Sequence, residues 1–166
     1  MDNAPRASIP GQRCRMDEHL SEHTDDHTAT ELDRLKIRHQ SDLRRMWELL
    51  MQPLGFRSTS VWVTFIGADA RPTRFLVEIA ESEQLPEPHE VANLFDVLEQ
   101  VCADEGEGTS VAFLVSRPGR DGVNAFDRSL AARLLAGARS SHLHCHPIHV
   151  ANDVAVRAVT LDDLAA

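Results

Sequence analysis

The sequence lacks long apolar runs and a cysteine framework. No stretch approaches the roughly 18 apolar residues of a membrane-spanning helix, and the N-terminus has no apolar core of a secretory signal. The three cysteines, Cys14, Cys102 and Cys145, are widely separated and odd in number. A disulfide framework normally needs an even set. We therefore expect a reduced, cytoplasmic chain that does not bind membranes.

Positive charge is also scarce. There are 17 Lys and Arg against 26 Asp and Glu, giving a formal net charge of −9, and Lys36 is the single lysine. Abundant arginine and alanine suggest a GC-rich bacterial genome. Nucleic acids and anionic membranes attract positively charged proteins, so general binding to either is not expected.

The charges are unevenly distributed along the chain. Segment 78–107 has ten acidic residues and no Lys or Arg, whereas segment 111–157 has six Arg and three Asp. Such a pattern is typical of a solvated acidic face. It also fits a homo-oligomer in which the acidic segment contacts the basic helical segment 31–46 of a second copy, an association that salt would weaken.

Sequence motifs of common enzymes are missing as well. The chain has neither the GxxxxGK[ST] nor the GxGxxG phosphate-binding pattern, and it has no GxSxG, HExxH or CxxC motif. Carboxylates are plentiful, but none can be paired as an acid and a base from sequence. We therefore assign no catalytic residue, metal or cofactor, and a non-enzymatic role is favoured over an enzymatic one.

Apolar residues, at 42% of a 166-residue chain, suffice for one packed domain. We expect this domain over 30–160, after a disordered or weakly helical tail at 1–29 and before a fraying tail at 161–166. Hydrophobic periodicity predicts the element order α-β-β-α-β-α-β-β, an α/β fold with a mixed sheet and flanking helices. The expected helices are 30–52, 89 to Gly106 or Gly108, and 124–140, and the expected strands are 60–66, 73–79, 110–115, 147–150 and 154–159.

The central feature is the apolar strand 110–115, which leads into a loop rich in Arg and Gly and then into a helix. Backbone amides, guanidinium groups and a helix N-terminus can together bind a carboxylate or phosphate. The alternative is that Arg117 and Arg120 are solvated or pair with Asp121 and Asp127 to fix the loop. The candidate anion-binding residues are Ser116, Arg117, Gly119, Arg120, Asn124, Asp127 and Arg128.

Two histidine clusters offer a different chemistry. His142, His144, Cys145, His146 and His149 lie within eight residues, although Pro147 interrupts them. In the N-terminal tail His19, His23 and His27 are spaced four apart, which would align them on one helix face. A polar loop and a polar tail with chance spacing are the alternatives to metal binding.

The region from Ser60 to Val159 resembles a known family in four features. These are the apolar strand 111–115, the sequence Arg117-Pro118-Gly119, Asp127 in the first turn of a helix, and the closing segment 147–152. In order and spacing they are similar to the RadC-like branch of the JAB/MPN metalloprotease-like superfamily. That family places a His-x-His-Pro-Ser-Gly loop after the strand and takes two His and the helix Asp as zinc ligands.

The departures from the family pattern concern the zinc ligands. Aligned on the proline, Val115 and Arg117 fill the two histidine positions, and aligned on Asp127, Leu114 and Ser116 fill them. The first strand, 60–66, also has no match for the family's water-activating Glu. The resemblance therefore implies a metal-free relative, since at most Asp127 of three ligands remains.

These observations predict a non-catalytic binding or scaffold module with an Arg-lined anion-binding loop. Its partner would be an acidic protein or a phosphorylated ligand, contacted by Arg117, Arg120 and Arg128. The alternative function is a metal-dependent enzyme or metal-responsive regulator that uses the cluster 142–149.

Overall fold

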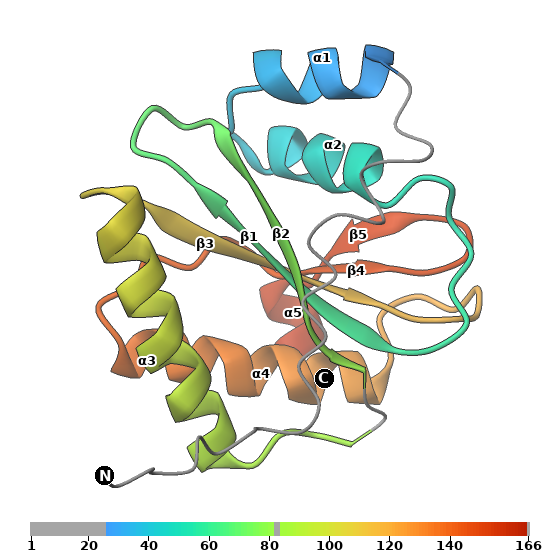
Figure 1. Ribbon diagram of the computed structural model, residues 1–166. Coiled ribbons are helices and arrows are strands. Elements are labelled where there is room, and N and C mark those ends of the chain that lie inside the picture. The colour runs from blue at the N-terminus through green and yellow to red at the C-terminus, as the bar shows by residue number, and fades with distance from the viewer. Residues whose placement is uncertain (1–25, 82–83, 166) are drawn as a thin grey trace, which may run out of the picture.

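A computed structural model describes residues 26–81 and 84–165. It contains one mixed five-stranded sheet with helices on both faces, which confirms the predicted α/β fold (Figure 1). The helices are α1 (Asp26–Arg34), α2 (Gln40–Leu50), α3 (Pro88–Glu105), α4 (Ala125–Ser140) and α5 (Leu161–Ala165). The strands are β1 (Ser60–Ile66), β2 (Pro72–Glu81), β3 (Ser110–Ser116), β4 (His149–Ala151) and β5 (Val156–Ala158).

The strands lie in the order β2-β1-β3-β4-β5. Strand β1 pairs antiparallel with both β2 and β3, β3 runs parallel to β4, and β4 pairs antiparallel with β5. A tight turn closes the β1–β2 hairpin, where the Ala70 amide donates to the Gly67 carbonyl. Strands β1 and β2, both predicted from the sequence, therefore form a hairpin.

Strand β3 lies at the middle of the sheet and is buried along its whole length. Because side chains alternate between the two faces of a strand, it contributes to two cores. Val111, Phe113 and Val115 pack in the core that α3 and α4 cover, whereas Ala112 and Leu114 pack in the core beneath α2. An uninterrupted apolar strand of this kind is typical of a strand covered on both faces.

The helix predicted over 30–52 is in fact two helices, α1 and α2. The break lies where the Ile37 amide donates to the Ala70 carbonyl of the hairpin turn and the Ile37 side chain is buried. The Asp42 carboxylate then accepts the amides of Arg38 and His39, which caps the start of α2. These tertiary and capping contacts outweigh the continuous helical periodicity of the sequence.

Helices also form at both ends of the described chain. Helix α1 begins at Asp26, within the segment predicted to be a tail, and the predicted C-terminal tail forms α5. The side chain and amide of Thr160 bond the Asp163 carboxylate, which caps this last short helix. Residues 1–25 of the predicted tail lie outside the described residues.

Within residues 26–81 and 84–165, every helix is too short or too polar to span a bilayer.

Helices α3 and α4 cross closely at Gly137, and this contact gives a stability prediction. A Cβ atom built there would lie 2.6 Å from ring carbons of Phe95 and from a methyl group of Val91. We expect Gly137→Ala to lower the free energy of unfolding by about 1–3 kcal/mol, although alanine is the better helix former. Urea denaturation followed by circular dichroism measures the change.

The matched control is Ser129→Ala, at an exposed position of the same helix. It should be neutral or slightly stabilising, because alanine has the higher helix propensity and no neighbour is displaced. Equal stability of the Gly137→Ala variant and the wild type would contradict the close packing at this crossing.

Candidate functional site

The candidate site lies where β3 ends and α4 begins. Asn124 is the N-cap of α4: its side-chain oxygen accepts the Asp127 amide at 2.9 Å, and the Asp127 carboxylate accepts the Asn124 amide at 2.9 Å. This reciprocal capping box satisfies two backbone donors at the helix start. The predicted helix start at Asn124 is therefore confirmed, and Asp127 has a structural role in it.

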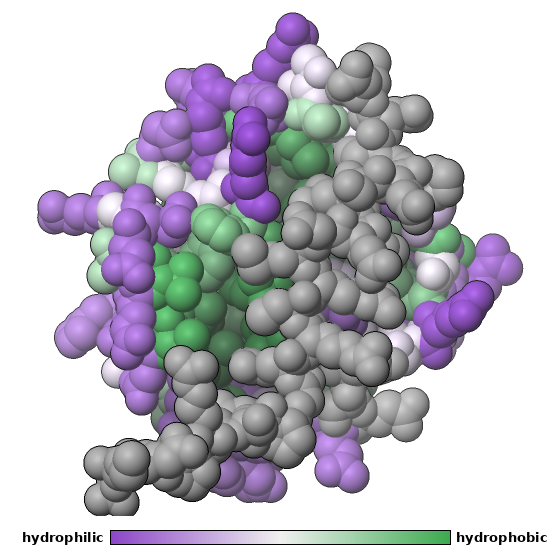
Figure 2. Space-filling model, in the orientation of Figure 1, coloured by the Kyte–Doolittle hydropathy of each residue, from purple (hydrophilic) through white to green (hydrophobic). Residues whose placement is uncertain are grey.

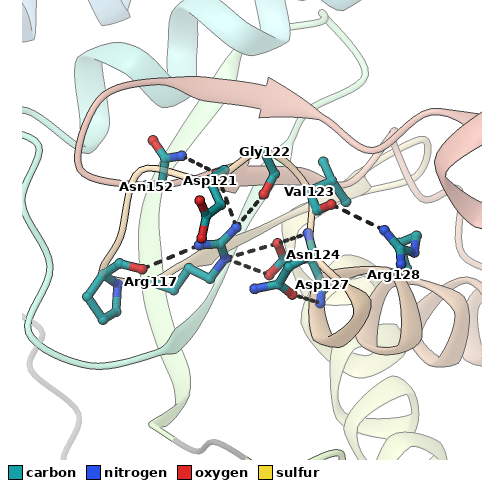
Figure 3. A network of polar contacts seen from close by, with 9 residues as sticks. Arg117, Asp121, Gly122, Val123, Asn124, Asp127, Arg128 and Asn152 are labelled. Atoms are coloured by element: carbon teal, nitrogen blue, oxygen red, sulfur yellow. Dashed lines mark hydrogen bonds and ion pairs between the residues drawn. The ribbon is translucent and has the colours of Figure 1, made fainter.

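Arg117 points into the protein, where it pairs with Asp127 (Figure 3). Its Nε lies 3.0 and 2.9 Å from the two carboxylate oxygens of Asp127. The Asp127 side chain is fully buried, and the Arg117 side chain is 7% exposed. Of the environments that the sequence allows for Arg117, the structure shows the ion pair with Asp127 that fixes the loop.

The rest of the Arg117 guanidinium binds the loop that it starts. Its Nη1 donates to the Pro118 carbonyl at 3.3 Å, and its Nη2 donates to the carbonyls of Asp121 and Gly122. Arg117 therefore contacts the backbone of Asp121 and not its carboxylate. A guanidinium has five donors in a fixed plane, and this arrangement uses most of them internally.

The turn between β4 and β5 closes the other side of the loop. The buried Asn152 donates from Nδ2 to the Asp121 carbonyl at 2.7 Å, and the Asp153 carboxylate accepts the Gly119 amide at 2.8 Å. Asp153 also accepts the Phe56 amide at 3.0 Å, from the segment before β1. These amide bonds, the one from Phe56 first and then that from Gly119, lower the pKa of Asp153, and the nearby Arg120 adds to the effect.

Asn152 and Asp153 were not among the residues predicted for the site. The sequence carried no signal for their part in it, because Asp153 is 34 residues from Gly119 and 97 residues from Phe56. The predicted residue Gly119 has φ of 106°, a conformation that side-chain-bearing residues rarely adopt. Gly119 thus allows the loop to approach Asp153.

The structure brings the remaining predicted residues to the same region but gives them different environments. Ser116 is buried and its Oγ accepts the Trp62 indole N–H at 2.9 Å. Arg128 is partly buried and donates to the Val123 carbonyl at 3.2 Å. Arg120 is exposed, and within the described parts of the chain no hydrogen bond or ion pair of its side chain is found.

The histidines of segment 142–149 do not converge. His142 and His144 are exposed, His146 Nε2 lies 2.9 Å from the Ser110 Oγ, and the rings of His144 and His146 meet edge to face at 4.9 Å. His149 is fully buried in β4 and bonds the Pro147 carbonyl through Nδ1 at 2.9 Å. Among the described residues no three His, Cys, Asp or Glu side chains are arranged to hold a metal ion.

The other predicted ligands contribute no metal site that the structure describes. His19 and His23 lie outside the described residues, as does the side chain of His27. Cys145, next to the histidines, is a free thiol whose pKa burial raises to about 12. At neutral pH the thiol is therefore protonated, which makes it a poor nucleophile.

Comparison with protein-family models and with curated proteins found no match to this chain.

The buried ion pair gives a second stability prediction. Arg117→Ala leaves the Asp127 carboxylate buried without its charge partner and removes the bonds to the loop carbonyls. We expect a loss of about 3–5 kcal/mol in the free energy of unfolding, the usual cost of breaking a buried pair from one side. Chemical denaturation at pH 7 measures it.

Arg120→Ala in the same loop is the matched control, since its side chain is exposed. Its effect should stay within about 0.5 kcal/mol. A similar stability for both variants would show that the Arg117–Asp127 pair does not hold the loop.

Two histidines, the fully buried His149 and the partly buried His146, predict how stability depends on pH. Burial lowers the pKa of His149 from 6.5 to about 4, partly opposed by its bond to Pro147, and burial followed by the charge of His144 lowers that of His146 to about 4. Between pH 6.5 and about pH 4, these two histidines bind protons in the unfolded chain but not in the folded chain. The free energy of unfolding should therefore fall as pH decreases from about 6.5 to 4, by up to about 1.4 kcal/mol per pH unit for the fully buried His149 and by less for His146, which solvent reaches in part.

Urea denaturation at several pH values between 7 and 4.5 checks this dependence. His149→Leu should flatten it, whereas His142→Ala, at an exposed position, should leave it unchanged. A pH-independent stability over this range would contradict the burial of neutral imidazoles.

Proposed function

We propose that this chain is a non-catalytic binding module, a metal-free relative of the JAB/MPN domains. In it the Arg117–Asp127 ion pair stands where the family has zinc and its ligands. The single observation that carries the proposal is the Arg117 guanidinium, buried and bonded to both Asp127 oxygens.

The geometry favours one of the two alignments to the family motif. The alignment on the proline puts Arg117 at the second histidine position, and Arg117 is the residue that contacts Asp127. In the alignment on Asp127, Ser116 is at the second histidine position. Its hydroxyl accepts a hydrogen bond from the Trp62 indole. The contact that a histidine would make with the metal is thus replaced by a contact between Arg117 and the third ligand.

The replacement removes the chemistry of a metal site. An arginine stays protonated at physiological pH, so it can act neither as a metal ligand nor as a general base. Its positive charge beside Asp127 also disfavours a divalent cation there. Both groups are used to fix the loop, which leaves the loop as a rigid surface and not as a reaction centre.

The binding surface that remains is the outer side of the loop 118–124. Arg117, Asn124 and Asp127 are committed to internal bonds, and Arg128 is partly buried and bonds the Val123 carbonyl. An anionic group of a partner would therefore meet the exposed Arg120 first. Arginine suits a carboxylate or a phosphate because its planar donors match two acceptor oxygens. We therefore assign the anion contact to Arg120.

A titration of ¹⁵N-labelled protein, separately with inorganic phosphate and with zinc chloride, tests this function. Phosphate should shift the amide signals of residues 119–126 in a saturable way, and Arg120→Ala should weaken the effect at least roughly tenfold, the size of one charge-assisted bond. Zinc should give no stoichiometric shift around Arg117 and Asp127.

The control is Arg139→Ala, which removes an exposed arginine from the last turn of α4, at the opposite end of this helix from the loop 118–124. It should leave the phosphate titration unchanged. Stoichiometric zinc binding at Asp127 would overturn the metal-free assignment, and phosphate shifts that persist in Arg120→Ala would overturn the assigned contact.

A further inference from the structure

Strand β2 is an edge strand of ten residues whose outer side pairs with no other described segment. The Phe75 carbonyl accepts the Thr64 hydroxyl of β1 at 2.7 Å, so it points toward the sheet. Backbone groups of successive residues point to opposite edges of a strand, and Leu76 therefore presents its N–H and C=O to the open edge. An open edge of this kind is a template for another strand.

The side chains of this strand leave apolar surface uncovered. Phe75 is 39% exposed and Val77 is 37% exposed, and both are large apolar residues of β2. Figure 2 shows apolar residues gathered over the part of the molecule where Figure 1 shows β2 and α3. Large apolar side chains on an unpaired edge mark a surface that another chain can cover.

The charges of β2 indicate which partner chain would cover this edge. Arg74 and Glu78 lie two residues before and two residues after Leu76. Arg74 is exposed and Glu78 partly exposed, and neither side chain has an ion pair or hydrogen bond with any other residue that the structure describes. Arg74 and Glu78 are thus charges of opposite sign at equal distances from Leu76.

Pairing of β2 with an antiparallel copy of itself satisfies both charges at once. With Leu76 opposite Leu76, Arg74 faces Glu78 of the second copy on one side of the sheet, and Phe75 faces Val77 on the other. Opposite charges and apolar pairs are the stabilising cross-strand neighbours. Shifting the centre to Val77 would place Leu76 opposite Glu78 and Arg74 opposite Ala80, so the charges select the first register.

Two irregularities in the β1–β2 pairing limit the length of this contact. They lie between Val61 and Trp62 and between Thr64 and Ile66, on either side of the regular pairs that β1 forms with residues 76–78. Bulges of this kind commonly restrict pairing at an edge. The contact is therefore short: residues 76–78 lie in the regular part of β2, and Arg74 and Phe75 lie at the start of the irregular part.

We propose that two copies of this chain associate through β2, antiparallel and with Leu76 on the two-fold axis. The two five-stranded sheets then form one continuous sheet of ten strands. Such an interface is isologous, because the same surface is used by both copies. It differs from the contact between the acidic and basic segments considered from the sequence, and it does not depend on the function proposed for the loop 118–124.

Sedimentation equilibrium of the full chain with charge-exchanged variants tests the interface. The wild type should dimerise reversibly with concentration. Arg74→Glu and Glu78→Arg, each made alone, place like charges opposite each other twice per dimer and should weaken association at least roughly tenfold. The double variant Arg74→Glu/Glu78→Arg should restore it, because the pairs are re-formed with the signs exchanged.

The control is the pair Arg139→Glu and Glu107→Arg, which reverses two exposed charges away from β2 and should leave the dimer unchanged. Circular dichroism confirms that each variant is folded. A wild type that remains monomeric at all concentrations overturns the proposal. This is the result expected if another segment of the chain covers the β2 edge. Single variants that dimerise like the wild type, or a double variant that fails to recover, overturn it as well.

Discussion

The buried ion pair between Arg117 and Asp127 is the contact on which the region around β3 and α4 depends. Both charges are removed from water, which costs several kcal/mol for each ion unless geometry and further bonds compensate. Here Arg117 contacts both oxygens of Asp127, and the Asn124 amide donates to the same carboxylate. Each group compensates the other, so neither is available to solvent or to a ligand.

The loop that this pair fixes is also bound by a segment that is distant in sequence. Arg117 holds the loop carbonyls of Asp121 and Gly122, and the turn after β4 binds that loop through Asn152 and Asp153. The loop is thereby fixed from inside and from its far side. A loop that is held in this way has a preorganised surface, with Arg117 and Asp127 neutralising each other inside it and Arg120 exposed on its outer side.

The centre of the sheet and its β2 edge differ in how completely other parts of the chain cover them. Strand β3 at the centre is buried by helices on both faces, whereas β2 at one edge exposes Phe75 and Val77. Helices pack on the middle of a sheet because most apolar area lies there, and an edge is left for turns, solvent or another chain. The two surfaces that we propose for partners, the outer side of the loop 118–124 and the β2 edge, lie on different parts of the fold.

The sequence by itself determined the α/β fold, the strands 60–66 and 110–115, and the N-cap at Asn124, because periodicity and capping are local properties. Only the tertiary structure decided the break between α1 and α2, which needs Ile37 to meet the distant Ala70. It also decided that Arg117 faces inward, since a solvated and a paired arginine are equally compatible with the sequence. The contacts of Asp153 with Gly119 and Phe56 likewise arise only when the chain is folded, because local patterns carry no record of them.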